Sequence, residues 1–452
     1  MALFKAVLAR LAYSSLLWLG TPFFLLRLWR RGAREPGYRL HCLQRLGWYG
    51  AAHREAVARA RLQTRRADAP WVWVHAVSLG ETLAARPLLE ALRAQWPGLR
   101  LLLTHGTATG REAGQALLQA GDVQTWLPYD TPGAVRRFIR AHRPSLGVLM
   151  ETEVWPNVQH QARCHGLPMV LANARLSEKS LRQGLRFASL LNPAAQAMTL
   201  ALAQTEDDAR RLRQAGVERV LVCGNLKFDL TPAPALLALG QRWAASSARP
   251  LVLAAVTREG EETELLQAWR RHLAVWRTPA TDDSTLPRLL IVPRHPQRFD
   301  EVAQWAQQEG WSLSRRSQWP ASGPDGQALA CEVWLGDSLR EMAAYYAAAS
   351  VALLGGSFAP LGGQNLIESA ACACPLIMGP HTYNFAQAAE LSEAAGAAYR
   401  VDSFEQALEA LPMLLAPERR ADMAARAVQF ARSHQGAAQR SAQALAGLWR
   451  AP

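Results

Sequence analysis

Short apolar runs that end in small or polar residues recur along the chain, and stretches with helical periodicity separate them. Such runs occupy residues 71–77, 101–104, 146–150, 251–255 and 289–292. Strands that alternate with helices in this way are typical of parallel βαβ units, so the pattern predicts an α/β fold. The carboxyl ends of parallel strands meet at one edge of a sheet, where open α/β sheets bind ligands. We therefore expect function to depend on the polar residues that follow these runs.

The strand and helix pattern stops once and then restarts. A proline-punctuated break at residues 229–234 separates two series of strands. With 452 residues, the chain also exceeds the size of one hydrophobic core. We expect a membrane anchor with a basic flank at 1–34, a Rossmann-like domain at 35–230, a linker at 231–250, and a second Rossmann-like domain with C-terminal helices at 251–452.

The N-terminal segment has the composition of a membrane anchor. Residues 11–26 carry no charge and include Trp18, and residues 27–34 contain four arginines. The apolar run is shorter than the ~20 residues that cross a bilayer comfortably, so a spanning helix and a helix lying in the interface both remain open. The arginines favour a protein body in the cytoplasm, near acidic lipids. A buried first helix of the domain is the alternative.

Residues 353–357 and 362–368 form the most distinctive stretch of the second series. A short apolar run ends there in paired glycines, and a second glycine pair precedes a predicted helix that begins near Gln364. Helix amides at this point would face a phosphate, and Asn365 and Glu368 share a helical face from which they can bond a ribose or a base edge. The stretch predicts a nucleotide site; a structural strand-turn-helix with a capping Asn is the alternative.

The charge of the chain favours an anionic partner. A formal net charge of +13 and an isoelectric point near 10.1 suit nucleic acid, acidic lipid headgroups or a phosphorylated substrate. The arginines are dispersed along helices without interleaved stacking aromatics, so we expect no nucleic-acid partner. The six cysteines are scattered, which indicates a reducing compartment and neither a disulfide framework nor a zinc site.

Two doubly wound domains, with the nucleotide signal in the second, are the layout of GT-B glycosyltransferases, in which two such domains face a cleft. Over nearly its whole length the chain resembles the 3-deoxy-D-manno-octulosonic acid (Kdo) transferase family of lipid A biosynthesis. The motifs that carry the resemblance are HAVSLGE at 75–81, LPYD at 127–130, METEVWPN at 150–157, LANARLS at 171–177, GNLKFD at 224–229, VPRHP at 292–296 and GPHTYNF at 379–385. Together and in this order they are specific.

The resemblance implies an inverting transfer of Kdo from CMP-Kdo onto the glucosamine disaccharide of a lipid A precursor (lipid IVA), without a cofactor, at the cytoplasmic face of the inner membrane. The first domain would bind the acceptor and the second the donor. By position, Glu81 would be the catalytic base, and Glu151 and Lys227 would support the transition state. The implied CMP contacts are Pro293, Arg294, Leu339, Arg340, Glu341, Asn365, Leu366, Ile367 and Glu368.

The chemistry of these residues agrees with such a transfer. An attacking sugar hydroxyl must lose its proton to a carboxylate, and Glu81 stands at a predicted strand-to-helix turn; a helix-start acid favoured by the helix dipole is the alternative role. Glu151 is the competing base, since alternate residues of an extended segment point to opposite faces and only one of Glu151 and Glu153 would face the site. No Asp-x-Asp element stands at a strand end, so we predict no metal and assign the leaving-group charge to Lys227 and Arg294.

Three other functions remain open. A GT-B transferase could use a different nucleotide sugar on a membrane lipid acceptor and would share the fold. A membrane-associated scaffold without catalytic activity would share the anchor and the basic charge. A nucleic-acid binder would explain the charge but not the motifs.

Overall fold

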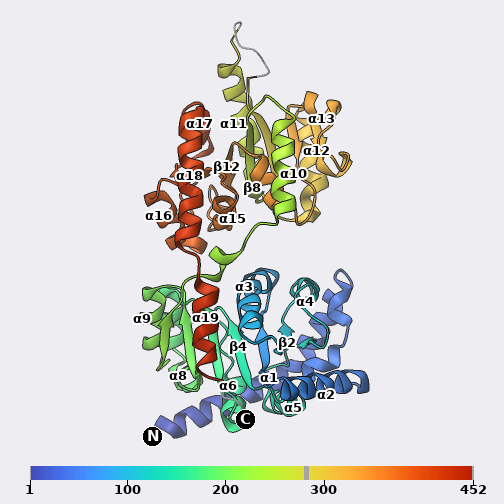
Figure 1. Cartoon of the computed structure of the whole chain (residues 1–452), viewed down its shortest axis with the longest axis vertical. Helices are drawn as coiled ribbons and strands as arrows, with labels where there is room; N and C mark the ends of the chain where they lie inside the picture. Colours follow the sequence, from blue (N-terminus) through green and yellow to red (C-terminus); the bar gives the residue numbers. More distant parts are fainter. Residues whose placement is uncertain (1, 279–284, 450–452) are drawn as a thin grey trace. The chain divides into compact units, whose positions relative to one another are not determined.

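The computed structural model describes residues 2–278 and 285–449, which form two compact units (Figure 1). The N-terminal unit comprises the chain up to Asp229 together with the last segment, from Gln435 onward. The C-terminal unit comprises Leu230–His434. Each unit is built on one seven-stranded parallel sheet. The α/β class with two Rossmann-like sheets is therefore confirmed.

The sheet of the N-terminal unit has the strand order β3-β2-β1-β4-β5-β6-β7. The central strand β1 pairs in parallel with β2 and β4. Alternate residues of β1 serve opposite faces: Trp71 and Trp73 pack into one core cluster, and Val72 and Val74 into another. The strands are β1 (Trp71–His75), β2 (Arg100–His105), β3 (Val123–Trp126), β4 (Leu146–Met150), β5 (Met169–Ala174), β6 (Leu200–Ala203) and β7 (Val220–Val222).

Helices cover both faces of this sheet (Figure 1). They are α1 (Ala2–Arg31), α2 (Ala51–Arg66), α3 (Leu79–Gln95), α4 (Ala108–Gln115), α5 (Pro132–His142), α6 (Pro156–Cys164), α7 (Glu178–Leu185), α8 (Ala188–Gln196), α9 (Glu206–Gln214) and α19 (Ala437–Ala446), with 3-10 turns η1 (Pro36–Arg39), η2 (Cys42–Leu46) and η3 (Leu226–Asp229).

The last helix, α19, packs on α3 of the N-terminal unit, whereas the sequence division put all of 251–452 into the second domain. The carboxylate of Asp229 accepts hydrogen bonds from the backbone N–H groups of Gly436 (2.5 Å) and Ala438 (2.6 Å). Asp229 therefore satisfies free N–H groups at the start of α19, a cap that comes from a residue distant in the sequence.

The sheet of the C-terminal unit has the order β10-β11-β9-β8-β12-β13-β14, again parallel throughout. Leu253 and Leu353, on its two central strands β8 and β12, are buried. The strands are β8 (Leu251–Thr257), β9 (Arg288–Pro293), β10 (Leu313–Arg315), β11 (Val333–Leu335), β12 (Val351–Leu354), β13 (Leu376–Met378) and β14 (Ala398–Arg400).

The helices of the C-terminal unit include one where the sequence suggested a linker. Residues 231–250 contain α10, which packs on α14 so closely that a Cβ at Gly240 would lie 2.1 Å from the carbonyl oxygen of Ala344. The helices are α10 (Pro234–Ala245), α11 (Glu261–Trp276), α12 (Phe299–Gln308), α13 (Gly326–Ala330), α14 (Met342–Ala348), α15 (Ile367–Ala371), α16 (Ala386–Ala394), α17 (Phe404–Leu415) and α18 (Pro417–Ser433), with 3-10 turns η4 (Pro296–Arg298), η5 (Arg316–Gln318) and η6 (Tyr383–Phe385).

Side-chain hydrogen bonds connect helix α1 to the rest of the N-terminal unit. The hydroxyl of Tyr13 donates to Asp130 (3.0 Å), and the side-chain amide of Asn157 donates to the hydroxyl of Ser14 (3.0 Å). Asp130 also accepts from the backbone N–H groups of Asn157 (3.0 Å) and Val158 (2.8 Å). By length and composition, Phe4–Arg31 would also suffice to cross a membrane.

Candidate active site

Glu81 lies in the first turn of α3, directly after β1. Ser78 caps the helix, and its hydroxyl donates to Oε1 of Glu81 (3.0 Å), while the backbone N–H of Val77 donates to Oε2 (2.8 Å). The sequence S-L-G-E supplies one half of a capping box, in which the Ser78 hydroxyl accepts from the backbone N–H of Glu81 (3.4 Å), while the Glu81 carboxylate accepts from Val77 and not from the backbone N–H of Ser78. Burial raises the pKa of Glu81, the Val77 hydrogen bond opposes this, and the charge of Glu151 adds to the rise.

Glu151 and Lys227 form an ion pair beside Glu81. Nζ of Lys227 lies 3.3 Å from Oε1 of Glu151, and both side chains are largely buried, with 18% and 22% exposed. Lys227 stands in η3, which is held by Asn173: the side-chain oxygen of Asn173 accepts from the backbone N–H of Leu226 (3.0 Å). The three predicted residues Glu81, Glu151 and Lys227 are close enough that the charges of the latter two act on the pKa of Glu81.

Glu153 joins this group, contrary to the expectation that only one of Glu151 and Glu153 would face it. Glu151 has a left-handed backbone (φ +61°), and the chain turns there instead of running on as an extended strand. Burial raises the pKa of Glu153 to about 7, and the charges of Glu81 and Glu151 contribute to the rise. The alternation rule failed because it applies only to extended backbone; a T-E-V-W-P stretch before a helix is a signal for such a turn.

The position of these groups follows from the strand order. β1 and β4 are neighbours in the sheet, although two strands separate them in the sequence, so their carboxyl ends form a topological switch point. Glu81 follows β1, and Glu151 follows β4 directly. Ligands of open α/β sheets bind at such points, and here the site presents three carboxylates and one lysine.

The C-terminal unit brings the candidate donor residues to one sheet edge as well. Arg294 follows β9, residues 339–341 follow β11, and residues 365–368 follow β12. Arg258 follows β8 directly and lies at the same edge, although the sequence motifs did not identify it as a candidate CMP-binding residue. Its charge, with those of Arg294 and Arg298, lowers the pKa of His295 after the effect of burial. An arginine immediately after a buried strand, as in V-T-R, is the signal that would have found Arg258.

The glycine turn after β12 is occupied by a side chain of the unit itself. The carboxylate of Glu261, at the start of α11, accepts from the backbone N–H groups of Gly356 (2.7 Å) and Arg258 (2.9 Å). It also lies within 3.4 Å of the backbone nitrogens of Phe358 and Ala359. The backbone amides of this turn, which the sequence predicted to bind a phosphate, thus bind the buried carboxylate of Glu261. Glu261 and Gly356 are 95 residues apart, so no local sequence pattern indicates this contact.

The helix after the glycines begins later than predicted. α15 begins at Ile367, not near Gln364, and Gly362 and Gly363 have left-handed backbones (φ +87° and +73°). The N-cap position of α15 is Leu366; the side-chain oxygen of Asn365, one residue earlier, accepts from the backbone N–H of Ile367 (3.3 Å). Burial raises the pKa of Glu368. Leu366 and Ile367 are buried, so they can contribute to a ligand site mainly through their backbone.

Leu339 and Glu341, two further predicted CMP contacts, differ in whether their side chains are free to bind a ligand. Leu339 is 65% exposed. Glu341, in contrast, is held by Arg316, whose Nε and Nη2 lie 3.0 and 2.9 Å from its two carboxylate oxygens. Arg340 between them has a left-handed backbone (φ +66°). Glu341 therefore stabilises this loop through Arg316.

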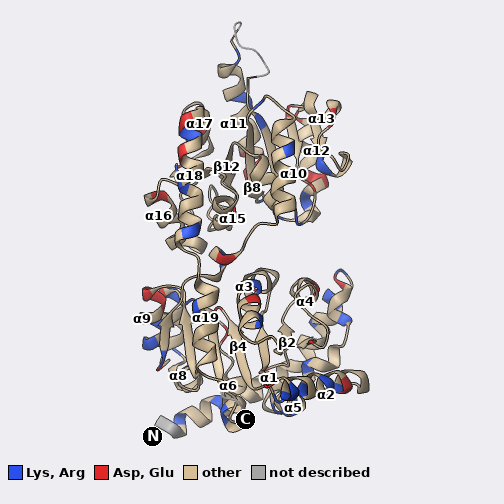
Figure 2. Ribbon diagram, in the orientation of Figure 1, with Lys and Arg blue, Asp and Glu red and all other residues tan. Residues whose placement is uncertain are grey.

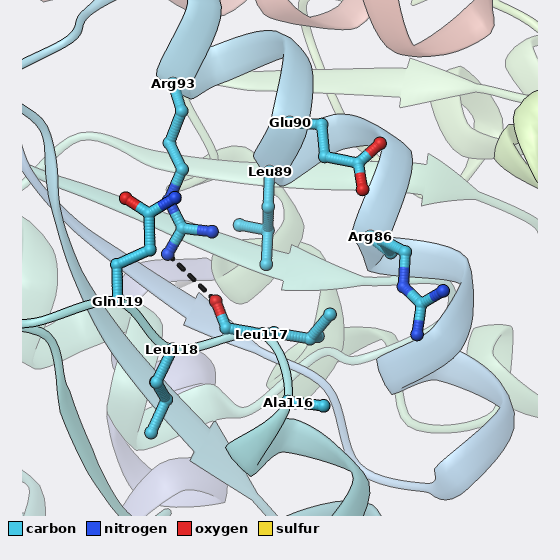
Figure 3. Close-up of a pocket in the computed structure, with 8 residues that line it drawn as sticks. All are labelled: Arg86, Leu89, Glu90, Arg93, Ala116, Leu117, Leu118 and Gln119. Carbon is cyan, nitrogen blue, oxygen red and sulfur yellow. Dashed lines mark hydrogen bonds between the residues drawn. The ribbon is translucent and has the colours of Figure 1, made fainter.

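A cavity of about 470 Å³ on the surface of the N-terminal unit is separate from these groups. It lies between α3 and residues 116–119 and is lined by Arg86 and Arg93 among others (Figure 3). The guanidinium of Arg93 donates to the carbonyl oxygen of Leu117 (2.9 Å) and to Asp122 (2.5 Å). None of its lining residues is a candidate catalytic or CMP-binding residue.

Comparison with known proteins places the chain in a family. A family model described as 3-deoxy-D-manno-octulosonic-acid transferase (kdotransferase) matches residues 41–230. The 3-deoxy-D-manno-octulosonic acid transferase of Bordetella pertussis is 46% identical over 437 residues, which cover 94% of this chain and 96% of that protein. The enzyme of the same name from Haemophilus influenzae is 32% identical over 409 residues, with 88% and 89% covered.

Solved structures of low sequence identity share the fold. Anabaena Alr3699/HepE in complex with UDP has a TM-score of 0.56 at 14% identity and covers 83% of this chain and 100% of its own. The S. aureus MnaA complex with UDP has a TM-score of 0.53 at 15% identity, with 85% and 99% covered. These similarities agree with the predicted GT-B class. On the strength of the sequence relatives, the chain belongs to the 3-deoxy-D-manno-octulosonic acid transferase family.

Proposed function

We propose that this chain moves Kdo from CMP-Kdo to the glucosamine disaccharide of a lipid A precursor, lipid IVA, and releases CMP with inversion at the transferred sugar. Membership of the family supports Kdo transfer as the reaction. The observation that carries the proposal is the group of Glu81, Glu151 and Lys227 at the switch point of the first sheet, in a chain that is 46% identical to a Kdo transferase.

Glu81 is the proposed general base. Each of its carboxylate oxygens accepts one hydrogen bond, from Ser78 or Val77, and keeps a lone pair for the acceptor hydroxyl. An efficient general base has a pKa near the working pH, and burial shifts the pKa of Glu81 upward, toward neutral pH. As the acceptor oxygen attacks the anomeric carbon of Kdo, its proton passes to Glu81. The bond from that carbon to the phosphate oxygen breaks, and CMP leaves with the electron pair.

Positive charge is proposed to stabilise the transition state at both ends of the transfer. The ammonium of Lys227, held 3.3 Å from Glu151, is proposed to stabilise the negative charge that moves during the attack. In the C-terminal unit, Arg294 and Arg258 follow neighbouring strands and are proposed to bind the phosphate of CMP. Because the amides of the glycine turn already bind Glu261, the arginines have to supply most of this charge.

The remaining CMP contacts are proposed around the same edge of the C-terminal sheet. Glu368 is a half-buried carboxylate whose pKa burial raises, and it suits a ribose diol as hydrogen-bond partner. Pro293, Leu339 and the backbone of residues 365–367 are proposed to contact the nucleotide directly. Glu341 is proposed to position Arg340 through its bond to Arg316.

The test is mass spectrometry of the lipid made from CMP-Kdo and a tetraacylated glucosamine disaccharide. The expected product is the acceptor plus Kdo, with equimolar CMP, and none should form from UDP- or ADP-sugars. Product from one of those donors instead would favour the alternative, a GT-B transferase that uses another nucleotide sugar. Absence of turnover with every donor, in folded protein, would favour the non-catalytic scaffold.

We also propose that α1 lies in the membrane interface and does not cross the bilayer. From residue 4 onward, the buried residues of α1 are polar, Ser14 and Thr21, while large apolar side chains such as Leu16, Leu19 and Phe23 are 67–79% exposed. The helix thus turns its polar stripe to the protein and its apolar stripe outward, as expected of an interfacial helix. The contacts of Tyr13 and Ser14 with Asp130 and Asn157 would have to break before α1 could span a membrane.

Basic residues near α1 suit an anionic lipid surface at the cytoplasmic face of the inner membrane. Lys and Arg are frequent on α1, α2 and α5 (Figure 2). Each Lys or Arg near an anionic surface adds about 1 kcal/mol of attraction. Acidic lipids are therefore the proposed partner of this part of the N-terminal unit.

Two measurements test the interfacial helix. Leu19→Ser with Phe23→Ser should lower co-sedimentation with anionic vesicles, whereas Val275→Ser, which is 73% exposed in the C-terminal unit, should not. An N-terminal tag on protein bound to the outside of sealed vesicles should stay open to protease. A tag that is protected from protease would show a spanning helix and refute the interfacial one.

A further inference from the structure

Two arginines of the N-terminal unit pack against one tryptophan. The guanidinium carbon of Arg45, in η2, lies 4.0 Å from the ring centre of Trp126, and that of Arg111, in α4, lies 4.9 Å away. Two further hydrogen bonds hold the backbone around Arg45 next to Trp126 and Tyr129. The indole N–H of Trp126 donates to the carbonyl oxygen of Leu40 (2.8 Å), and the backbone N–H of Tyr129 donates to that of Arg45 (2.8 Å).

Neither arginine is paired with a carboxylate within the part of the chain that the structure describes. Arg45 is 5% exposed and makes one side-chain hydrogen bond, from Nη2 to the carbonyl oxygen of Gly106 (3.2 Å), while its buried Nε has no partner. Nη1 of Arg111 is buried without a partner too. Burial, with the charge of Arg45, lowers the pKa of Arg111 to about 10. Two like charges are thus buried together, at a cost that an anion would offset.

Two tyrosine hydroxyls complete the group. The hydroxyls of Tyr38 and Tyr129 are buried and have no hydrogen-bond partner among the described residues, and both tyrosines interact electrostatically with Arg45. The ring of Tyr38 stacks on Trp126 at 6.2 Å with an interplanar angle of 9°. Arg45, Arg111 and Tyr38 lie against Trp126, and Tyr129 interacts with Arg45, so these four side chains offer four unused hydrogen-bond donors in one region. Buried donors of this kind are normally satisfied.

A purely structural arginine in the same chain looks different. Arg288 also packs on a tryptophan, 4.5 Å from the ring centre of Trp334, and burial lowers its pKa to about 10. Its guanidinium, however, donates to the carbonyl oxygen of Cys331 (3.0 Å), to the hydroxyl of Ser247 (3.1 Å) and to the carbonyl oxygen of Leu329. A buried arginine that only supports the fold is satisfied here by the protein itself, and Arg45 and Arg111 are not.

We propose that Arg45, Arg111, Tyr38 and Tyr129 bind an oxyanion of the acceptor, a phosphomonoester on the sugar that receives Kdo. A phosphate has three terminal oxygens and can use all four donors, whereas a carboxylate has two. This proposal rests on the proposed function for the identity of the substrate. The oxyanion site itself rests on the unused donors alone.

The site lies one loop away from the proposed base. Gly106, whose carbonyl oxygen accepts from Arg45, donates its backbone N–H to the carbonyl oxygen of Val77 (3.1 Å). Val77 in turn donates its N–H to Glu81 (2.8 Å). Arg45 and Glu81 are thus attached to adjoining backbone segments at the same edge of the sheet, and one acceptor molecule is proposed to contact both.

The first test measures kinetics with a phosphorylated acceptor and with the same acceptor after phosphatase treatment. Arg111→Gln and Tyr129→Phe should raise the KM for the phosphorylated acceptor, about tenfold or more for Arg111→Gln, and leave the KM for CMP-Kdo unchanged. With the dephosphorylated acceptor, the variants and the wild type should be alike. Arg210→Gln, which removes the same charge from a position of α9 that is 62% exposed, is the control and should match the wild type.

Equal losses on both acceptors, or a raised KM for CMP-Kdo instead, would overturn the acceptor phosphate site. The second case would point to the carboxylate of the sugar acid as the anion. Inorganic phosphate provides a test without turnover when saturating CMP already occupies the proposed donor site: it should raise the Tm of the wild type and of Arg210→Gln, but not of Arg45→Gln or Arg111→Gln. A phosphate response that survives in both variants would refute the site, whether or not the protein transfers Kdo. Tyr129→Phe, which removes one hydroxyl only, keeps the test valid if Arg45→Gln fails to fold.

Discussion

Replacing Glu81 by Gln tests the proposed base with little disturbance of the fold. The Gln oxygen can accept from the backbone N–H of Val77, and its NH₂ can donate to the hydroxyl of Ser78, which is able to turn round and accept. Two charge-assisted bonds become neutral ones, which costs about 1–2 kcal/mol of stability. Removal of a general base typically lowers the rate by ~10²–10⁴, or about 3–5 kcal/mol of transition-state stabilisation.

The assay compares Glu81→Gln with Glu151→Gln and Glu153→Gln, each with its CMP affinity and Tm. In the wild type, kcat/KM should rise with pH up to the raised pKa of Glu81 and then level off, since only the deprotonated carboxylate accepts a proton. This rise should vanish in Glu81→Gln, while CMP affinity persists. Near-normal turnover in Glu81→Gln, with collapse only in Glu151→Gln, would move the base to Glu151 and leave Glu81 as a helix cap.

Three further predictions concern the donor site and stability. Glu368→Ala should weaken CMP binding by about 1–3 kcal/mol in calorimetry, and unchanged affinity would remove Glu368 from the site. Arg258→Gln should weaken CMP binding but not cytidine binding, because it removes a phosphate contact; equal losses for both ligands would contradict this role. His142, hydrogen-bonded to His53 at 2.8 Å, has a folded pKa lowered to about 3 by burial. The unfolded chain binds the proton of His142 first, so below the unfolded pKa of His142 the wild type should lose about 1.4 kcal/mol more of urea-unfolding stability per pH unit than His142→Gln does; equal losses between pH 6 and pH 5 in the two proteins would contradict this.

The sequence by itself determined the strands and the local helix starts. β4 and β11 begin and end where their apolar runs do, because burial on both faces of a parallel strand demands a continuous apolar run. The S-x-x-E pattern of Ser78 and Glu81 predicted a strand-to-helix turn, since the cap is made by residues three apart. Polar residues after strands also pointed to one functional edge in each unit, because parallel strands end together.

Tertiary structure alone decided which groups meet. Glu153 joins Glu81 because Glu151 turns the chain in a left-handed conformation, and Glu261 fills the glycine turn from the start of another helix. Asp229 caps α19 across more than 200 residues. These contacts depend on which chain segments lie side by side in the folded units, and the pattern of neighbours along the sequence carries no record of such long-range partners.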